Sequence, residues 1–401
     1  MRVSEASMRE AWLRTLGTTQ SQLARTQNQI STGLRFSKPS EDPIGAVQSL
    51  DLSRALAENS QYSRNSDLAA NRLGAEETTL ASVGDVLQRL HELAVEANNA
   101  TQTNETRSGI ASEVREALGT LIQLANTRDG TGNYLFAGFS SLTQPFSLVG
   151  GTVAYSGDQG QRQIQIGSNR QLKDSDNGAS IFQAILDGNG VFSAGANPAN
   201  AGTGLVGQRT VVDPAQYDGG TYAINFTSPT AYEVRDAANV LVTSGTIQIG
   251  QAVVPAIAFR GIQFELTGQP AAGDSFQVAA SRNQDMFTTV QNFISSLETP
   301  VNTAAGQAQL NNKVGNVLND LDQAISHVLD VRAQVGSRLN AIDAQKDINS
   351  DIDLHTQALL SQVKDLDYAD AISRLNIQLT GLTASEKAFA QTQNLSLFNY
   401  L

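Results

Sequence analysis

The sequence contains no cysteine, one tryptophan, three histidines and unusually few charged residues. Without cysteine, the chain can form neither disulfides nor thiolate metal sites. Charged residues make up 16% of the chain, whereas an average soluble domain has about 25%. Gln, Asn, Ser, Thr and Ala take their place, and such residues suit crowded helix–helix contacts and long polar interfaces.

Charge and hydropathy restrict the partners. The net charge is −12 and the pI is about 4.7, which argues against nucleic acid, because phosphate binding requires basic patches. No apolar run approaches the roughly 18 residues of a membrane span, so we expect no membrane insertion. The segment MRVSEASMREAW lacks the apolar core of a signal peptide. A cytoplasmic protein and one exported by a signal-independent route both fit.

Motifs for chemistry are scarce. His91, His327 and His355 are isolated within helical sequence, so none has a second histidine at metal-ligand spacing. GTGLVG (202–207) matches a dinucleotide-loop string but opens no helix, and DSDNG (174–178) lacks the later ligands of a calcium loop. We therefore expect no enzyme, no cofactor and no metal.

Both ends of the chain carry apolar stripes whose spacing alternates between three and four residues, which is typical of coiled coils. Polar residues interrupt both stripes, and such residues lower stability while they fix register. Either the two ends pair as ordinary amphipathic helices, or the stripes are satisfied only when subunits assemble. The stripes are Leu13, Leu16, Gln20, Leu23, Gln27, Ile30 and Leu34, and Ile372, Leu375, Leu379, Leu382, Glu386, Phe389, Gln393, Ser396 and Tyr400.

Further helical stripes occur at 73–97, 110–124, 286–297 and 310–335, whereas the middle of the chain alternates with the strand period of two. The alternating segments are RQIQIG, TYAINF, TIQIG and GIQFEL. We predict an α+β protein: an elongated helical coiled-coil rod of paired N- and C-terminal segments, with a mainly antiparallel β domain inserted.

Three domains follow from this layout. We expect a terminal coiled-coil domain of residues 1–45 and 360–401, disordered in the monomer, and a helical rod domain of residues 46–133 and 284–359. A β-rich outer domain should span residues 134–283.

The segment QISTGLRFSKPSEDPIGA (29–46) interrupts the first helical region. Gly33, Pro39, Pro43 and Gly45 fall within thirteen positions, and proline both removes a helix donor and disfavours helical geometry in the preceding residue. We predict that these four residues form an interdomain joint that keeps the two helices from fusing.

Several segments resemble the bacterial flagellin superfamily. They are the interruption at 29–46, LQRLHELAVEANNATQTNETRSGIASEV (87–114), LANTRDGTGNYLFAGF (124–139) and RAQVGSRLNAID (332–343). The likeness covers about 1–140 and 284–401. Within the superfamily, the ends MRVS and SLFNYL are similar to those of the hook-associated junction proteins.

This resemblance implies a structural flagellar protein that adapts the hook side to the filament. It implies export, unfolded, by the flagellar type III route to an extracellular location. The implied partners are the first hook-associated junction protein, flagellin, further copies in a ring, and an export chaperone on the C-terminal helix, roughly 360–401. The alternatives are flagellin itself and, from a different class, a secreted coiled-coil adhesin.

The stripes then provide the candidate assembly interface. Its residues are Leu13, Leu16, Leu23, Ile30, Leu34, Leu375, Leu379, Leu382, Phe389 and Leu397. The resemblance also implies an epitope for a Toll-like receptor at Arg89, Leu93 and Glu113. We favour the simpler interpretation that these three are rod-surface and packing residues.

Overall fold

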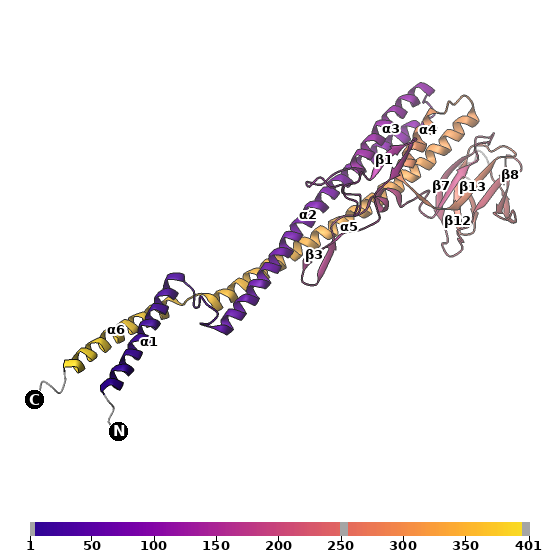
Figure 1. Cartoon of the computed structure of the whole chain (residues 1–401). Helices are drawn as coiled ribbons and strands as arrows, with labels where there is room; N and C mark the ends of the chain where they lie inside the picture. The colour runs from indigo at the N-terminus through magenta and orange to yellow at the C-terminus, as the bar shows by residue number, and fades with distance from the viewer. Residues whose placement is uncertain (1–4, 249–255, 395–401) are drawn as a thin grey trace, which may run out of the picture. The chain divides into compact units, whose positions relative to one another are not determined.

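The computed structural model describes residues 5–248 and 256–394 and divides into two compact units. The terminal unit comprises Met1–Arg64 and Ala344–Leu401, and the central unit comprises Asn65–Asp343. Helices α2 and α5 each contribute residues to both. The α-helices are α1 (Glu5–Thr32), α2 (Pro43–Ala97), α3 (Asn104–Ala125), α4 (Met286–Glu298), α5 (Ala304–Lys364) and α6 (Tyr368–Asn394) (Figure 1).

The predicted α+β class is confirmed: helical regions at both ends flank a middle region of antiparallel strands. Local signals explain several helix ends. The Asp285 side chain accepts the Thr288 N–H at 2.7 Å and caps α4, and Thr103 forms a capping box with Thr106 at the start of α3.

The strands form five antiparallel sheets within the described residues. Their spatial orders are β10-β9-β8-β13-β6, β11-β12-β7, β1-β2, β3-β4 and β14-β5. The strands are β1 (Phe146–Val149), β2 (Thr152–Tyr155), β3 (Gln163–Gly167), β4 (Arg170–Lys173), β5 (Ile185–Leu186), β6 (Phe192–Ala196), β7 (Leu205–Val211), β8 (Tyr222–Phe226), β9 (Ala231–Asp236), β10 (Leu241–Thr246), β11 (Ala256–Phe259), β12 (Ile262–Thr267), β13 (Ser275–Ala280) and β14 (Asn283–Gln284).

Three of the four predicted strand segments are confirmed as β3, β8 and β12. The prediction at TIQIG is wrong in its described part, because β10 ends at Thr246, where that segment begins. A turn at Asp236–Val240 sets the β9–β10 register, and β9 begins at Ala231, which pairs with Thr246. The residues that follow Thr246 therefore have no partner on β9, and the Ile247 N–H donates to the carbonyl of Thr230, which precedes β9. Residues 249 and 250 lie outside the described residues.

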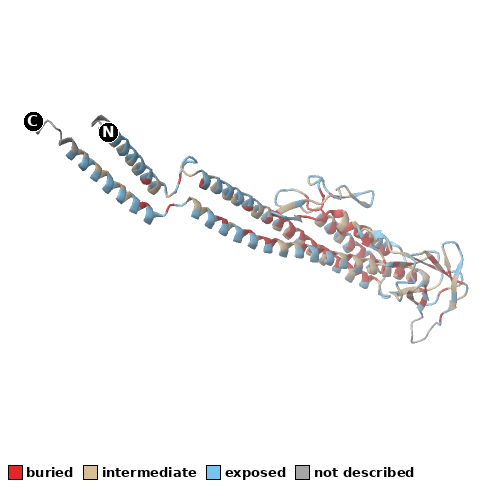
Figure 2. Cartoon of the chain, turned by 90° about the horizontal axis from the view of Figure 1, so that it is seen from below, coloured by how far each residue is buried: buried red, intermediate tan, exposed pale blue. Residues whose placement is uncertain are grey.

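The central unit contains two hydrophobic cores. The first consists of apolar side chains of α2, α3, α4 and α5 together with residues between 135 and 185. It includes the rings of Phe146, Phe182 and Phe287, whose centroids lie 5.1–5.8 Å apart. The second lies between the two larger sheets, within 192–278. Residues 134–190 thus share a core with the helices. In Figure 2, buried positions gather along the central unit, whereas α1 and α6 are mostly exposed or intermediate.

Candidate functional site: an assembly interface

Helices α1 and α6 pack side by side in the terminal unit and run antiparallel (Figure 1). At one end, the rings of Trp12 and Phe389 stack with centroids 3.6 Å apart and an interplanar angle of 9°. At the other end, the Leu366 N–H donates to the Gly33 carbonyl at 2.9 Å. The two ends of the chain therefore pair within one molecule.

The burial pattern defines the contact face of this pair. Its members are the less exposed residues, and they repeat at alternating spacings of three and four on both helices. On α1 they are Trp12, Leu16, Thr19, Leu23, Thr26 and Ile30, and on α6 they are Ala371, Leu375, Gln378, Leu382, Ser385 and Phe389. Only Thr26 and Ala371 among these are fully buried, so the pair is a shallow one.

This contact face accounts for most of the predicted interface residues. Leu16, Leu23, Ile30, Leu375, Leu382 and Phe389 lie on it, and Leu34 is half-buried beside it. Leu13 and Leu379 do not lie on it: they are 54% and 41% exposed. Leu397 lies outside the described residues.

Other large apolar side chains of the terminal unit are exposed as well, which is a feature of surfaces that meet a partner. They extend along both helix pairs of the unit. They are Ile44, Val47, Leu50, Ile348, Ile352, Leu354, Leu359, Tyr368, Ile372 and Ile377.

The second helix pair of the terminal unit consists of the first part of α2 and the last part of α5, and its contact is polar. The Asn59 side chain donates to the Asn349 carbonyl at 2.6 Å, and the Gln345 side chain donates to the Asn349 side chain at 2.9 Å. All three residues are buried. Buried amides fix register at a cost in stability, so this pair has one preferred alignment.

The joint between α1 and α2 is well defined. Gly33 adopts φ +71°, which favours glycine, and a Cβ there would lie 3.0 Å from the Tyr368 hydroxyl. The Arg35 N–H donates to the Lys364 carbonyl at 2.8 Å. Together with the Leu366–Gly33 hydrogen bond, this forms an antiparallel bridge that binds the joint to the α5–α6 connection.

Asp42 and Pro43 start α2. The Asp42 side chain accepts the Gly45 N–H at 2.9 Å, and Pro43 occupies the first helical position, where its missing N–H costs nothing. This Gly45 N–H, and next the Arg35 guanidinium, hold the pKa of Asp42 below its usual value. A Cβ at Gly45 would lie 2.9 Å from the ring of Phe36.

Pro39 lies in the turn that precedes this cap. The Glu41 carboxylate accepts the Ser37 N–H at 2.8 Å, which is the main reason why the pKa of Glu41 is lowered. Pro39, Pro43 and both glycines are evident from the sequence, whereas Phe36, Asp42 and Leu366 also belong to the joint and were not predicted. An Asp-Pro pair before a helix is a readable capping signal. Phe36 is buried with its ring beside Gly45. Leu366 lies in the α5–α6 connection, far along the chain from the joint, so no local pattern links the two.

The three residues of the implied receptor epitope, Arg89, Leu93 and Glu113, are only partly accessible. The Arg89 guanidinium lies 2.7 Å from Glu113, and both side chains are half-exposed. Leu93 is 1% exposed and belongs to the first core of the central unit. The folded surface therefore presents Arg89 and Glu113 without Leu93.

Among the described residues, no group of three or more His, Asp or Glu side chains is placed to hold a metal ion. His327 contacts the Ser180 carbonyl at 2.8 Å, and His91 lies 3.3 Å from Asp322. No helix in the described ranges is long and apolar enough to cross a membrane.

Comparison with known proteins identifies similar chains. Residues 3–141 match the bacterial flagellin N-terminal helical region, and residues 318–401 match the bacterial flagellin C-terminal helical region. The flagellar hook-associated protein 3 of Escherichia coli K12 is 27% identical over 405 residues, which is 99% of each chain.

Solved structures agree. The crystal structure of Xanthomonas campestris FlgL is 36% identical with a TM-score of 0.72, covering 77% of this chain and 99% of that one. The flagellar junction protein FlgL of Legionella pneumophila is 28% identical with a TM-score of 0.71, covering 79% and 99%. Flagellin FlaB1 of Treponema pallidum aligns over only 35% of this chain.

Proposed function

This chain belongs to the FlgL, or hook-associated protein 3, family of the flagellin superfamily, and we infer that it is a structural subunit of the bacterial flagellum at the hook–filament junction. The observation that carries this inference is the length of the match. The chain aligns with a hook-associated protein 3 over 99% of both sequences, whereas the flagellin alignment stops at about a third of the chain. The filament-subunit alternative is therefore disfavoured.

We propose that the terminal unit is the assembly interface and that its two faces have different tasks. Leu16, Leu23 and Ile30 hold α1 against α6 within one chain. Leu13 on α1 and Ile372 and Leu379 on α6 face outward, and we propose that they contact neighbouring subunits. Burying a fully exposed leucine is worth about 1.5–3 kcal/mol, so a few such residues per subunit suffice to favour assembly.

A position at the hook–filament junction implies two binding partners for this chain. One side of the assembled ring would contact the first hook-associated junction protein, and the other side would contact flagellin. Export would occur through the flagellar type III route, with a chaperone covering the exposed apolar residues of α6. Leu379 and Ile377 support the chaperone proposal, because they would otherwise be open to aggregation before export.

Deletion of the gene in its source bacterium tests the junction proposal. We expect cells with hooks but without filaments, and flagellin in the culture medium, because filament growth would have no junction to start from. Re-expression of the wild-type gene should restore filaments. Normal filaments in the deletion strain would contradict the proposal.

The joint is proposed to set the angle between α1 and α2. A Pro39→Ala, Pro43→Ala double variant removes the proline constraints from the segment before α2 and should reduce motility when it replaces the wild-type protein. A Pro229→Ala variant, in a loop of the β region, is the matched control. Full motility of the double variant would show that the helix break is dispensable.

A further inference from the structure

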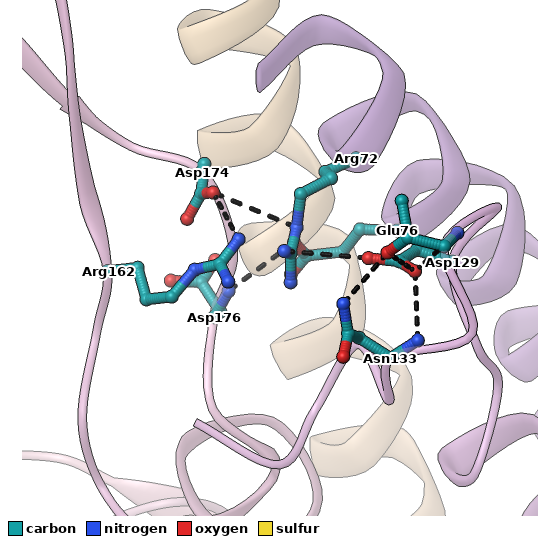
Figure 3. Close-up of polar contacts among 8 residues, drawn as sticks. Arg72, Glu76, Asp129, Asn133, Arg162, Asp174 and Asp176 are labelled. Atoms are coloured by element: carbon teal, nitrogen blue, oxygen red, sulfur yellow. Dashed lines mark hydrogen bonds and ion pairs between the residues drawn. The ribbon is translucent and has the colours of Figure 1, made fainter. Parts of the chain in front are cut away.

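A cluster of charged side chains, most of them buried, lies where the loops before and around β3 and β4 meet helices α2 and α5 in the central unit (Figure 3). Arg72 and Glu76 come from α2, Arg338 comes from α5, and the other members come from loops. These are Asp129, Arg162, Asp174 and Asp176. Asp174 and Asp176 belong to the DSDNG segment, whose first four residues are all buried.

Each arginine of the cluster has an aspartate partner. Arg162 lies 2.8 Å from Asp174, and Arg338 lies 2.8 Å from Asp176. Arg72 lies 3.5 Å from Asp129 and 3.7 Å from Asp174. Three guanidinium groups therefore face three aspartates, and the charges balance without the fourth carboxyl group, that of Glu76.

Glu76 has no cationic partner within ion-pair distance among the described residues. It is 1% exposed, its Oε1 atom is buried without a hydrogen-bond partner, and its Oε2 atom accepts the Asp176 N–H at 3.4 Å. An ionised carboxylate in such a place has lost its hydration, and few hydrogen bonds or ion pairs compensate for that loss. A protonated carboxyl group carries no charge and can donate a hydrogen bond to the neighbouring Asp176 carboxylate.

We propose that Glu76 is a neutral carboxylic acid in the folded chain and that its proton closes a latch, the DSDNG segment (174–178), against α2 and α5. When the proton is lost, Glu76 carries a second negative charge beside Asp176, and the nearby cation, Arg338, already pairs with Asp176. Their repulsion opens the latch.

Burial, and next the Asp176 charge, raise the pKa of Glu76 well above its usual value, while Arg338 opposes the shift. A carboxyl group with a raised folded-state pKa stabilises the fold below its unfolded pKa. This contribution is lost as pH rises through the folded pKa. The latch should therefore open toward alkaline pH.

The latch controls access to the first core of the central unit. The Gly178 N–H donates to the Phe136 carbonyl at 2.8 Å, and the π-helix η1 (Ala179–Gln183) that follows carries Ile181 and Phe182 into that core. On the α5 side, His327 contacts the Ser180 carbonyl. Opening the latch would expose Phe182 and its aromatic neighbours.

Hydrogen exchange of the full-length chain between about pH 6 and about pH 9 tests the proposal, after correction for intrinsic exchange. In the wild type, the opening constant of the 170–185 peptides should rise by up to about tenfold per pH unit where the pH lies between the open-state pKa and the raised folded-state pKa of Glu76, and should level off above the folded-state pKa. In Glu76→Gln this rise should fall below about twofold, because a neutral amide replaces the neutral acid. Peptides from β12 and β13 serve as the internal reference.

Glu77→Gln is the matched control, because Glu77 is the next residue on α2 but pairs with Arg332 at 2.7 Å. It should keep the wild-type pH dependence. An infrared difference spectrum of wild type minus Glu76→Gln at neutral pH provides a direct readout and should contain the carbonyl stretch of a protonated carboxyl group. Absence of this band, equal pH dependence of the two proteins, or latch opening in Glu76→Gln at neutral pH would each overturn the proposal.

Discussion

Replacing Leu23 by alanine tests whether α1 and α6 hold together within one chain. Leu23 is partly buried on the contact face of α1. A fully buried Leu→Ala change costs about 2–5 kcal/mol, and because water can fill part of the space here, we expect about 1–2 kcal/mol. This cost raises the opening constant of the helix pair roughly 5- to 30-fold.

Leu13→Ala is the matched control, since it removes the same atoms from the same helix at a position that is 54% exposed. We expect its effect on the pair to stay within about 0.5 kcal/mol, while subunit assembly weakens. Hydrogen exchange of α1 and α6 peptides in the monomer measures the first effect. Sedimentation of assembled material measures the second.

Either of two results would contradict an intrachain α1–α6 pair with Leu23 on its contact face and Leu13 outside it. One is an unchanged opening constant in Leu23→Ala, including the case in which the wild-type peptides already exchange without protection. The other is an effect of Leu13→Ala on the monomer as large as that of Leu23→Ala, which would place Leu13 on the contact face.

Four further predictions concern the terminal unit. Gly33→Ala should destabilise it by about 1–2 kcal/mol, measured by chemical denaturation, because φ is positive there and the Tyr368 hydroxyl lies close. Asp42→Ala should fray the start of α2, seen as faster hydrogen exchange at residues 43–50. In the wild type, the ionised Asp42 stabilises this helix start, and that stabilisation is lost as pH falls through the lowered Asp42 pKa; the variant should lack this pH dependence. Asn59→Leu should raise the denaturation midpoint while broadening the set of α2–α5 alignments detected by spin-label distances; a single unchanged distance would contradict this. Limited proteolysis should cut residues 1–40 and 365–401 faster in the monomer, where the shallow helix pair opens transiently, than after assembly.

The stripe on α1 shows how far sequence periodicity can go. Leu16, Leu23 and Ile30 were predicted and do lie on the contact face. The contact positions between these three residues differ from the prediction by one residue. In the structure they are Trp12, Thr19 and Thr26, whereas the sequence periodicity favours Leu13, Gln20 and Gln27. Both choices alternate spacings of three and four around the same heptad residues. Only the position of α6 decides between them.

The middle region shows a second limit. Strands β3, β8 and β12 alternate clearly in sequence, whereas β6 (FSAGA) contains small residues and gives no such signal. β6 is a strand because it pairs with β13, about 80 residues further along the chain. Likewise, the DSDNG segment looked like an incomplete calcium loop. Its aspartates are instead buried beside arginines from distant helices, Arg72 of α2 and Arg338 of α5.

The most direct test of the junction account is seeded growth. Purified subunits are added to sheared flagellar filaments from the source bacterium, and filament length is followed by electron microscopy. A hook–filament adaptor should show no extended growth on these seeds, whereas purified flagellin, as the positive control, should lengthen them. Continuous, regular growth from this chain alone would contradict the account and identify a filament subunit.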